Sequence, residues 1–253
     1  MRLHGAMFAG FVMVAMSLPA QSRDEPPLRV LFVGNSYLYV NDLPAQVERL
    51  AALRGRTVRT TLQAAPDYGL VDHLHDRRFD RVLEQQWDWV VLQQGPSASS
   101  HARAELIASV RTIAERLHGR SLRIALVAGW PASRNASMSP AAERSYRDAA
   151  AAVGACVMPV ATAWRLARAD ERAPTLYAAD GLHATRMGTR LAALTVVDGL
   201  FGPARSAPAA ANRAAGPRET ALLAAASAAY AEEAMRCGAL DASTATAPAR
   251  IGY

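Results

Sequence analysis

Three residues whose side chains could together perform nucleophilic catalysis occur in two separate segments of the chain. Ser36 follows Gly34 and Asn35 directly after a short apolar run, and Asp180 and His183 lie three residues apart far downstream. A serine hydroxyl is a weak nucleophile near neutral pH. It needs an imidazole that takes its proton and a carboxylate that orients that imidazole. Because Asp180 and His183 can meet within one turn, we expect the second ring nitrogen of His183 to face Ser36.

Each of these two segments has a simpler interpretation when it is taken alone. Glycine and serine are common in strand-to-helix turns as capping residues, and an aspartate before a helix can cap it with an exposed histidine beside it. The presence of both segments in one chain favours catalysis, because together they supply a nucleophile, a base and a carboxylate.

Short apolar runs alternate with amphipathic stretches from residue 28 onward. We expect strands over residues 28–33, 57–62, 89–92, 122–127 and 156–158, and helices over 43–53, 102–117, 141–153 and 185–200. This alternation predicts an α/β fold with a flavodoxin-like, doubly wound, five-stranded parallel sheet and helices on both faces. Ligands of such sheets bind beyond the carboxyl ends of the strands, which is where we expect Ser36.

The two chemical segments resemble blocks of the SGNH (GDSL-like) hydrolase superfamily. Residues 34–36, Gly-Asn-Ser, are similar to its first block, usually written GDS, and residues 180–183, Asp-Gly-Leu-His, are similar to its final DxxH block. Gly188 and the Leu-Ala-Ala of 191–193 also resemble the helix that follows DxxH. The resemblance covers roughly residues 28–200 and implies the SGNH hydrolase fold, with Ser36, His183 and Asp180 as catalytic residues.

The resemblance also implies an oxyanion hole, to which the backbone N–H of Ser36 contributes. The second block supplies a glycine N–H, for which Gly69 lies in the expected place. The third block is normally GxND, but this chain has Gln93 and Gln94, followed by Gly-Pro and Ser97, after the third expected strand. A glutamine amide is the same kind of donor as asparagine on a longer arm. We favour Gln93 for this role, then Gln94, and Ser97 least.

Departures from the family pattern place the chain in a divergent branch of the superfamily. Besides the glutamines, Asn35 stands where the first block has Asp, and Tyr37 stands where it has Leu. Tyr37 beside the nucleophile and Trp130 after the fourth strand are candidates for substrate binding, because both lie at the ligand edge of the sheet. Core packing is an equally good interpretation of Trp130.

The remainder of the chain predicts export. Residues 1–20 have a basic start, an apolar run and a small residue at the end, which is typical of a secretory signal peptide. An uncleaved anchor is the alternative, although the apolar run is short for a bilayer span. We expect a hydrolase-like domain over 26–202, a linker over 203–216, and an Ala-rich helix and tail over 217–253. The protein would then be periplasmic or secreted.

The basic composition does not indicate nucleic acid as a partner. The formal net charge is +6 and every basic residue is arginine, but these arginines are scattered among acidic residues with no long basic run. His73 and His75 are interpreted as part of a solvated polar stretch rather than as metal ligands. For Cys156, a disulfide with Cys237 and a buried free thiol are both consistent with the sequence.

Together these features predict a serine esterase that hydrolyses small acyl esters, with acetate as the favoured acyl group, because no long apolar lid segment is apparent. We expect a small-molecule or carbohydrate ester as substrate, no metal or organic cofactor, and no stable membrane span after signal cleavage. Two alternatives remain open at this stage. One is an acyltransferase with the same site, and the other is a binding protein that keeps the fold without turnover.

Overall fold

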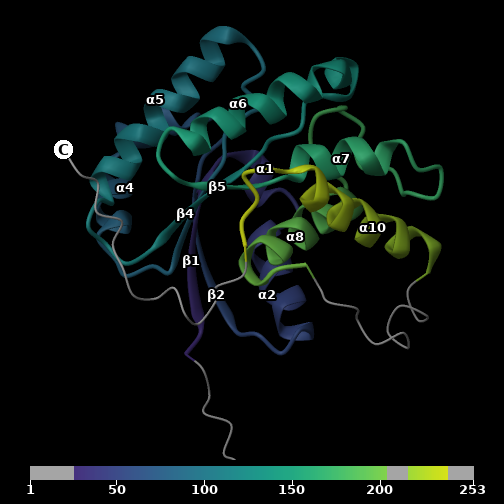
Figure 1. Cartoon of the computed structure of the whole chain (residues 1–253), viewed down its shortest axis with the longest axis horizontal. Coiled ribbons are helices and arrows are strands. Elements are labelled where there is room, and N and C mark those ends of the chain that lie inside the picture. Colours follow the sequence, from purple (N-terminus) through teal and green to yellow (C-terminus); the bar gives the residue numbers. More distant parts are fainter. Residues whose placement is uncertain (1–25, 204–215, 239–253) are drawn as a thin grey trace, which may run out of the picture.

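Five parallel strands form the centre of the protein in the order β2-β1-β3-β4-β5 (Figure 1). The computed structural model describes residues 26–203 and 216–238. The strands are β1 (Leu28–Gly34), β2 (Val58–Ala64), β3 (Trp89–Leu92), β4 (Arg123–Val127) and β5 (Cys156–Met158). The prediction of an α/β fold with a doubly wound, five-stranded parallel sheet is confirmed. The expected signal peptide, most of the linker and the tail beyond residue 238 lie outside the described residues.

Helices cover both faces of this sheet because successive side chains of its central strands point to opposite sides. Val30 and Phe32 of β1 belong to one apolar cluster, and Leu31 and Val33 belong to the other. The first cluster is completed by α2 (Leu43–Leu53), α7 (Val160–Arg168), α8 (Arg186–Phe201) and α10 (Pro217–Glu232). The second is completed by α3 (Leu70–Leu74), α4 (Arg77–Leu83), α5 (Ser100–Arg116) and α6 (Ser139–Ala151). Figure 1 shows α5 and α6 on one side of the sheet and α2 and α8 on the other.

Four short helices and α7 are the elements that the sequence did not predict. These are α1 (Ser36–Tyr39), α3, α4, the 3-10 helix η1 (Ser133–Met138) and α7. The first four are too short to show a helical period. In α7, the first five residues are all buried, and the polar side that Arg165 and Arg168 form comes only in its last turn.

The C-terminal segment packs against the α/β unit. Tyr230 of α10 donates from its hydroxyl to the carbonyl oxygen of Thr195 in α8 at 2.8 Å, and Glu219 pairs with Arg190 at 2.6 Å. After α10, Arg236 forms a parallel bridge with Val157 at the edge strand β5. No helix within the described ranges combines the length and the apolar content that a membrane span needs.

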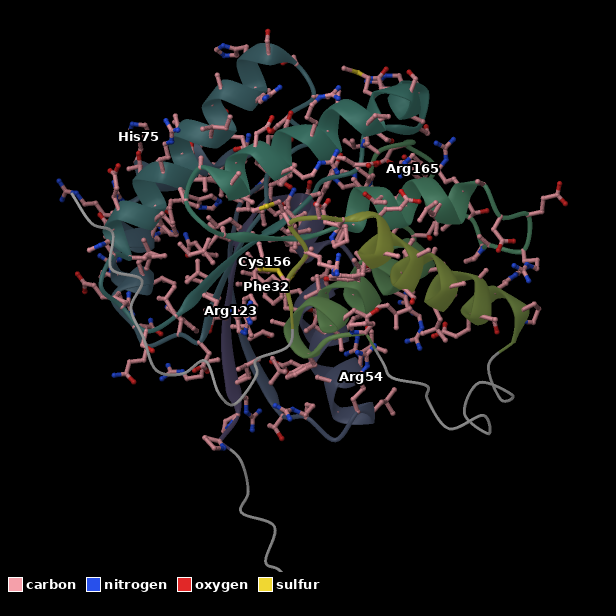
Figure 2. The ribbon with its side chains drawn as sticks, in the orientation of Figure 1. Phe32, Arg54, His75, Arg123, Cys156 and Arg165 are labelled. Carbon is pink, nitrogen blue, oxygen red and sulfur yellow. A yellow bond between two sulfur atoms is a disulfide. The ribbon has the colours of Figure 1, made fainter. Side chains whose placement is uncertain are left out.

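A disulfide joins Cys156 of β5 to Cys237, and Figure 2 shows its yellow sulfur atoms beside the Cys156 label. This resolves the alternative that the sequence left open for Cys156. The bond closes a loop of sequence separation 81. In the chain-entropy model such a loop stabilises the folded state by roughly 4 kcal/mol, because it restricts the unfolded chain.

Candidate active site

Ser36 lies at the carboxyl end of the central strand β1, where the chain turns into α1. Asn35 is the N-cap of this helix, and its side-chain oxygen accepts a hydrogen bond from the N–H of Tyr37 at 3.2 Å. The side-chain amide of Asn35 donates to the carbonyl oxygen of Tyr68 at 3.0 Å, which ties this turn to the loop after β2. Ser36 itself is partly exposed.

The structure brings Ser36, His183 and Asp180 into one chain of hydrogen bonds. Nε2 of His183 lies 2.9 Å from Oγ of Ser36, and Nδ1 lies 2.6 Å from Oδ2 of Asp180. A carboxylate only accepts, so Nδ1 carries the proton and Nε2 is free to accept from the serine hydroxyl. This is the arrangement that a general base for serine requires.

Asp180 is held as a carboxylate by three donors. The hydrogen bond from the His183 ring, with those from the backbone N–H groups of Leu182 and His183, lowers the pKa of Asp180 from 3.8 to about 2. Both backbone bonds reach Oδ1 at 2.9 Å, so Oδ2 remains for the ring. The side chains of His183 and Asp180 are 29% and 48% exposed, so the site is open to water.

Two hydrogen bonds, donated by the segment after β4 to backbone carbonyl oxygens, hold the turn that carries His183. The carbonyl oxygen of Gly181 accepts from the N–H of Ser133 at 2.7 Å, and that of Leu182 accepts from the indole N–H of Trp130 at 3.0 Å. Gly181 has a φ of +69°, and a Cβ there would lie 2.6 Å from Oγ of Ser133. The left-handed backbone conformation, which other residues rarely adopt, is therefore what favours glycine in this turn.

Tyr37 and Trp130, the candidate substrate-binding residues, lie in a buried aromatic stack next to the triad. Their rings are 4.4 Å apart and nearly parallel, and Trp130 stacks on Trp164 at 4.0 Å. Tyr37 is 6% exposed and Trp130 is 1% exposed. The Tyr37 hydroxyl donates to the carbonyl oxygen of Trp130 at 3.1 Å, and burial raises the pKa of Tyr37 well above its usual value. These contacts match the packing interpretation of Trp130, and they place both side chains against the segments that carry Ser36 and His183.

The two glutamines lie at the carboxyl end of β3, beside the nucleophile turn. Gln93 is fully buried. Its side-chain oxygen accepts from the N–H of Asn35 at 3.2 Å, and its amide donates to the carbonyl oxygen of Gln94. Gln94 accepts from the N–H of Leu70 at 3.0 Å and donates to Oγ of Ser97 at 2.8 Å. Both polar atoms of Gln93 are thus used inside the protein.

Gly69 lies next to Gln94 but its backbone N–H has a partner in this structure. The N–H donates to Oδ2 of Asp72 at 2.8 Å, as the first turn of α3 begins. A Cβ at Gly69 would lie 3.5 Å from the side-chain oxygen of Gln94, which places the expected second and third blocks side by side.

His73 corrects the expectation of a solvated polar stretch. It is fully buried, and its Nε2 lies 2.8 Å from the carbonyl oxygen of Gly34, directly before the nucleophile turn. His75 is exposed, as expected. His73 is buried because α3 packs Leu70 and His73, three residues apart, toward the core. That spacing was the signal in the sequence that would have identified His73.

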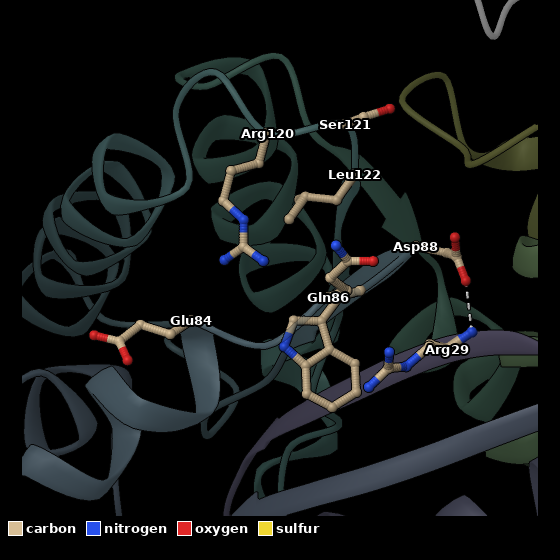
Figure 3. A pocket seen from close by; sticks show the side chains of 8 residues that line it. Arg29, Glu84, Gln86, Asp88, Arg120, Ser121 and Leu122 are labelled. Carbon is tan, nitrogen blue, oxygen red and sulfur yellow. Dashed lines mark hydrogen bonds between the residues drawn. The ribbon is translucent and has the colours of Figure 1, made fainter.

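A pocket of about 470 Å³ lies at the other end of the sheet (Figure 3). It is lined by residues that precede or begin the strands, among them Arg29, Asp88 and Leu122. The N–H of Arg29 donates to Asp88 at 2.6 Å, and Arg120 donates to backbone carbonyl oxygens. The pocket lies at the amino ends of the strands, whereas Ser36 follows the carboxyl end of β1. It is therefore separate from the site around Ser36, which is at the edge where ligands of parallel sheets bind.

Comparisons with known proteins were made by sequence and by structure. No protein-family model matches the chain, and no curated protein matches it. A solved structure assigned as an SGNH hydrolase, from Slackia heliotrinireducens, is 28% identical, with a TM-score of 0.57 over 68% of this chain and 98% of that chain. A DUF4886 family protein from Bacteroides uniformis is 18% identical, with a TM-score of 0.67 over 81% and 95%. A lipase/acylhydrolase from Enterococcus faecalis is 19% identical, with a TM-score of 0.56 over 67% and 93%.

Proposed function

The chain has the fold of the SGNH/GDSL-like hydrolase superfamily, and on that premise we propose that it is a serine esterase acting on small acyl esters. The observation that carries the proposal is the continuous hydrogen-bond chain from Asp180 through His183 to Oγ of Ser36. Its atoms come from two segments that are 147 residues apart in sequence. Packing two remote segments into this geometry supports a catalytic role for them.

The proposed reaction begins with attack of Oγ of Ser36 on the ester carbonyl carbon. His183 takes the hydroxyl proton at Nε2, and the ionised Asp180 stabilises the resulting imidazolium. When the tetrahedral intermediate collapses, the ester C–O bond breaks and His183 gives the proton to the leaving alcohol. The acyl group is then bonded to Ser36, and a water molecule activated by His183 releases it as the acid.

We propose that the oxyanion is held by the N–H groups of Ser36 and Gly69 and by the side-chain amide of Gln94. Gln94 is preferred to Gln93 because its side chain lies beside Gly69, the other expected donor, whereas the side-chain oxygen of Gln93 is bonded to the N–H of Asn35. The Gln94 amide has a second N–H beyond the one bonded to Ser97. Gly69 can take this role only when its N–H leaves Asp72. Each such donor is worth about 3 kcal/mol in the transition state.

The openness of the site supports hydrolysis over acyl transfer. His183 is 29% exposed on its side chain and Asp180 is 48% exposed, so water has ready access to the base. An acyltransferase gains from excluding water from its acyl-enzyme. An open triad also suits esters on bulky carriers, and we propose acetyl or similarly small groups on a small molecule or carbohydrate as the substrate class.

Export is proposed as the cellular context, on two grounds. Residues 1–20 have the pattern of a secretory signal, and the Cys156–Cys237 disulfide is of a kind that persists in oxidising compartments. The proposal is tested by fractionating a bacterial host that expresses the full chain. Recovery of a shortened protein from the periplasm or medium supports export, and a full-length protein confined to the cytosol contradicts it.

The activity is tested with p-nitrophenyl acetate and a fluorophosphonate probe on the purified protein. We expect hydrolysis and labelling by wild type and neither by Ser36→Ala. Ser145→Ala is the matched control, because that buried serine bonds only within its own helix and should keep both signals. A well-folded wild type without labelling would favour a binding protein instead. An acyl product that appears only when an alcohol acceptor is added would favour a transferase.

A further inference from the structure

The peptide unit between Gly34 and Asn35, directly before the nucleophile, is held at both of its polar ends. Its carbonyl oxygen lies 2.8 Å from Nε2 of His73, and its N–H donates to the side-chain oxygen of Gln93 at 3.2 Å. Both side chains are fully buried, and they come from different elements, α3 and the end of β3. One peptide plane is therefore bound by two side chains that have no contact with solvent.

His73 makes its contact at a cost that an apolar residue would avoid. A carbonyl oxygen only accepts, so Nε2 carries the proton. Burial lowers the pKa of His73, against the opposing effects of Gly34, Asp72 and Asp76, and the ring is therefore neutral. Its Nδ1 is then a buried acceptor without a partner. Such an atom calls for an explanation, because a leucine or phenylalanine would fill the same space without it.

The surroundings of His73 show what its ring supplies beyond volume. It packs edge-on to Tyr68 at 5.1 Å and against Phe79 at 5.7 Å between ring centres. These aromatic neighbours fix the ring plane but offer no bond to Nδ1. The property that distinguishes histidine here is one rigid N–H donor aimed at the Gly34 carbonyl.

Gln93 binds the other end of the peptide plane, at 3.2 Å against 2.8 Å for His73. Its amide donates to the carbonyl oxygen of Gln94, which leaves its side-chain oxygen fixed under the N–H of Asn35. A Cβ at Gly34 would lie 2.4 Å from that oxygen, so only glycine allows this approach. The glycine before the nucleophile is thus explained by the glutamine.

We propose that His73 and Gln93 are positioning residues that clamp the Gly34–Asn35 peptide, and thereby hold Oγ and the N–H of Ser36 in line with His183. The inference rests on the proposed esterase function and assigns Gln93 a role other than oxyanion donor. The angle of this peptide plane sets the direction in which Ser36 leaves β1. Displacements of about 1 Å between reacting groups can cost about 100-fold in rate.

The test compares variants of the full, oxidised chain that remove or keep the donor at position 73. His73→Leu removes it, and His73→Gln keeps an amide N–H near the position of Nε2. Leu83→Ala perturbs the same apolar cluster one turn further along α4 than Phe79. We expect His73→Leu to lower kcat and the rate of fluorophosphonate labelling by about 10- to 100-fold with KM nearly unchanged. His73→Gln should recover most of this loss, and Leu83→Ala should lower the melting temperature without lowering kcat.

A second variant, Gln93→Met, tests the other half of the clamp. If the two side chains act as one unit, the double variant His73→Leu with Gln93→Met should lose little more than the worse single variant. Two independent effects that multiply would overturn the shared clamp. Equal kcat in His73→Leu and wild type, or equal losses in the Leu and Gln variants, would overturn the role of His73.

Failure of the clamp and failure of the esterase are distinguishable. Ser36→Ala that still hydrolyses the ester would overturn the proposed function, whereas an inactive Ser36→Ala beside a fully active His73→Leu would overturn only the clamp. If wild type shows no turnover, the ring-nitrogen NMR shifts of His73 still decide the geometry. A ring whose Nε2 carries a proton at pH 7 supports the bond to Gly34, and a neutral ring protonated only at Nδ1 contradicts it.

Discussion

The indole N–H of Trp130 donates a hydrogen bond of 3.0 Å to the carbonyl oxygen of Leu182, the residue before His183. The same indole stacks on Tyr37, the residue after Ser36. Trp130 therefore contacts the immediate neighbour of the nucleophile with its ring face and the immediate neighbour of the base with its ring edge. It is thus one physical connection, beside the Ser36–His183 bond itself, between the two segments whose alignment the proposed reaction needs.

Replacement of Trp130 tests this connection. Trp130→Phe keeps a stacking ring but leaves the Leu182 carbonyl without its donor, and we expect kcat to fall by roughly 3- to 10-fold with little change in KM. The matched control is Trp89→Phe, since Nε1 of that buried indole has no hydrogen-bond partner. Steady-state kinetics decide the matter. Equal effects of the two substitutions would mean that only aromatic packing matters.

Substitution of Asp180 tests the proposed support of the base. Asp180→Asn removes the charge that stabilises the imidazolium and can present an N–H to Nδ1, which favours the wrong tautomer. We expect kcat to fall by about 100- to 10,000-fold with KM nearly unchanged. The loss is measured with p-nitrophenyl acetate at neutral pH. A loss below threefold would remove Asp180 from the mechanism.

The pH dependence of stability carries a second signature of Asp180. Its pKa is lowered from 3.8 to about 2 in the folded state by the bonds from His183 and the backbone. A depressed carboxyl pKa stabilises the fold above the unfolded value and loses that contribution as pH falls through the folded one. The difference in melting temperature between wild type and Asp180→Asn should therefore be constant above pH 5 and shrink between pH 3.8 and about 2. A difference that does not change over this window would contradict the assignment.

Asp72 offers a test in which activity and stability move in opposite directions. Its carboxylate occupies the Gly69 N–H that we propose as an oxyanion donor. Asp72→Ala should raise kcat/KM by about twofold to fivefold by freeing that donor, and lower the melting temperature by removing a bond at the start of α3. Kinetics and thermal melts on one preparation give both results. A fall in kcat/KM that merely follows the loss of stability would exclude Gly69 as a donor.

The role of Gln94 is tested against its own neighbour. Gln94→Leu should lower kcat by about 100-fold or more, as expected for the loss of one oxyanion donor. Ser97→Ala removes only the partner of that amide and should cost less than about fivefold, because the Gln94 amide itself remains. If Ser97→Ala is the more damaging of the two, the serine and not the amide is the third donor.

The sequence predicted the elements whose patterns are local and missed those set by packing. The strand at Trp89–Leu92 was predicted with its exact bounds, because four consecutive apolar residues are buried on both faces. The helix α7 was missed because its first five residues are all buried and its arginines come only in the last turn. His73 was missed because it looks polar in sequence, and only the docking of a five-residue helix against β1 buries it.

The surroundings of the Gln93 and Gln94 side chains could not be predicted from the sequence for a different reason. Neighbouring residues at the end of a strand point in opposite directions. This alternation holds only within the strand, so the directions of the Gln93 and Gln94 side chains depend on the residue at which β3 ends. The structure ends β3 at Leu92, and the Gln93 side chain then meets the backbone of Asn35. A shift of one residue in that boundary would exchange the directions in which the two glutamine side chains point.

The Cys156–Cys237 bond closes a covalent ring of chain that contains only part of the site. Asp180 and His183 lie inside the ring of chain that the disulfide closes, whereas Ser36 lies outside it. In an oxidised but unfolded molecule the base and its carboxylate thus belong to a covalent macrocycle, and the nucleophile belongs to a free arm. Hydrolytic activity therefore reports the noncovalent docking of that arm onto the macrocycle, and a reductant loosens only one of the two halves that must meet.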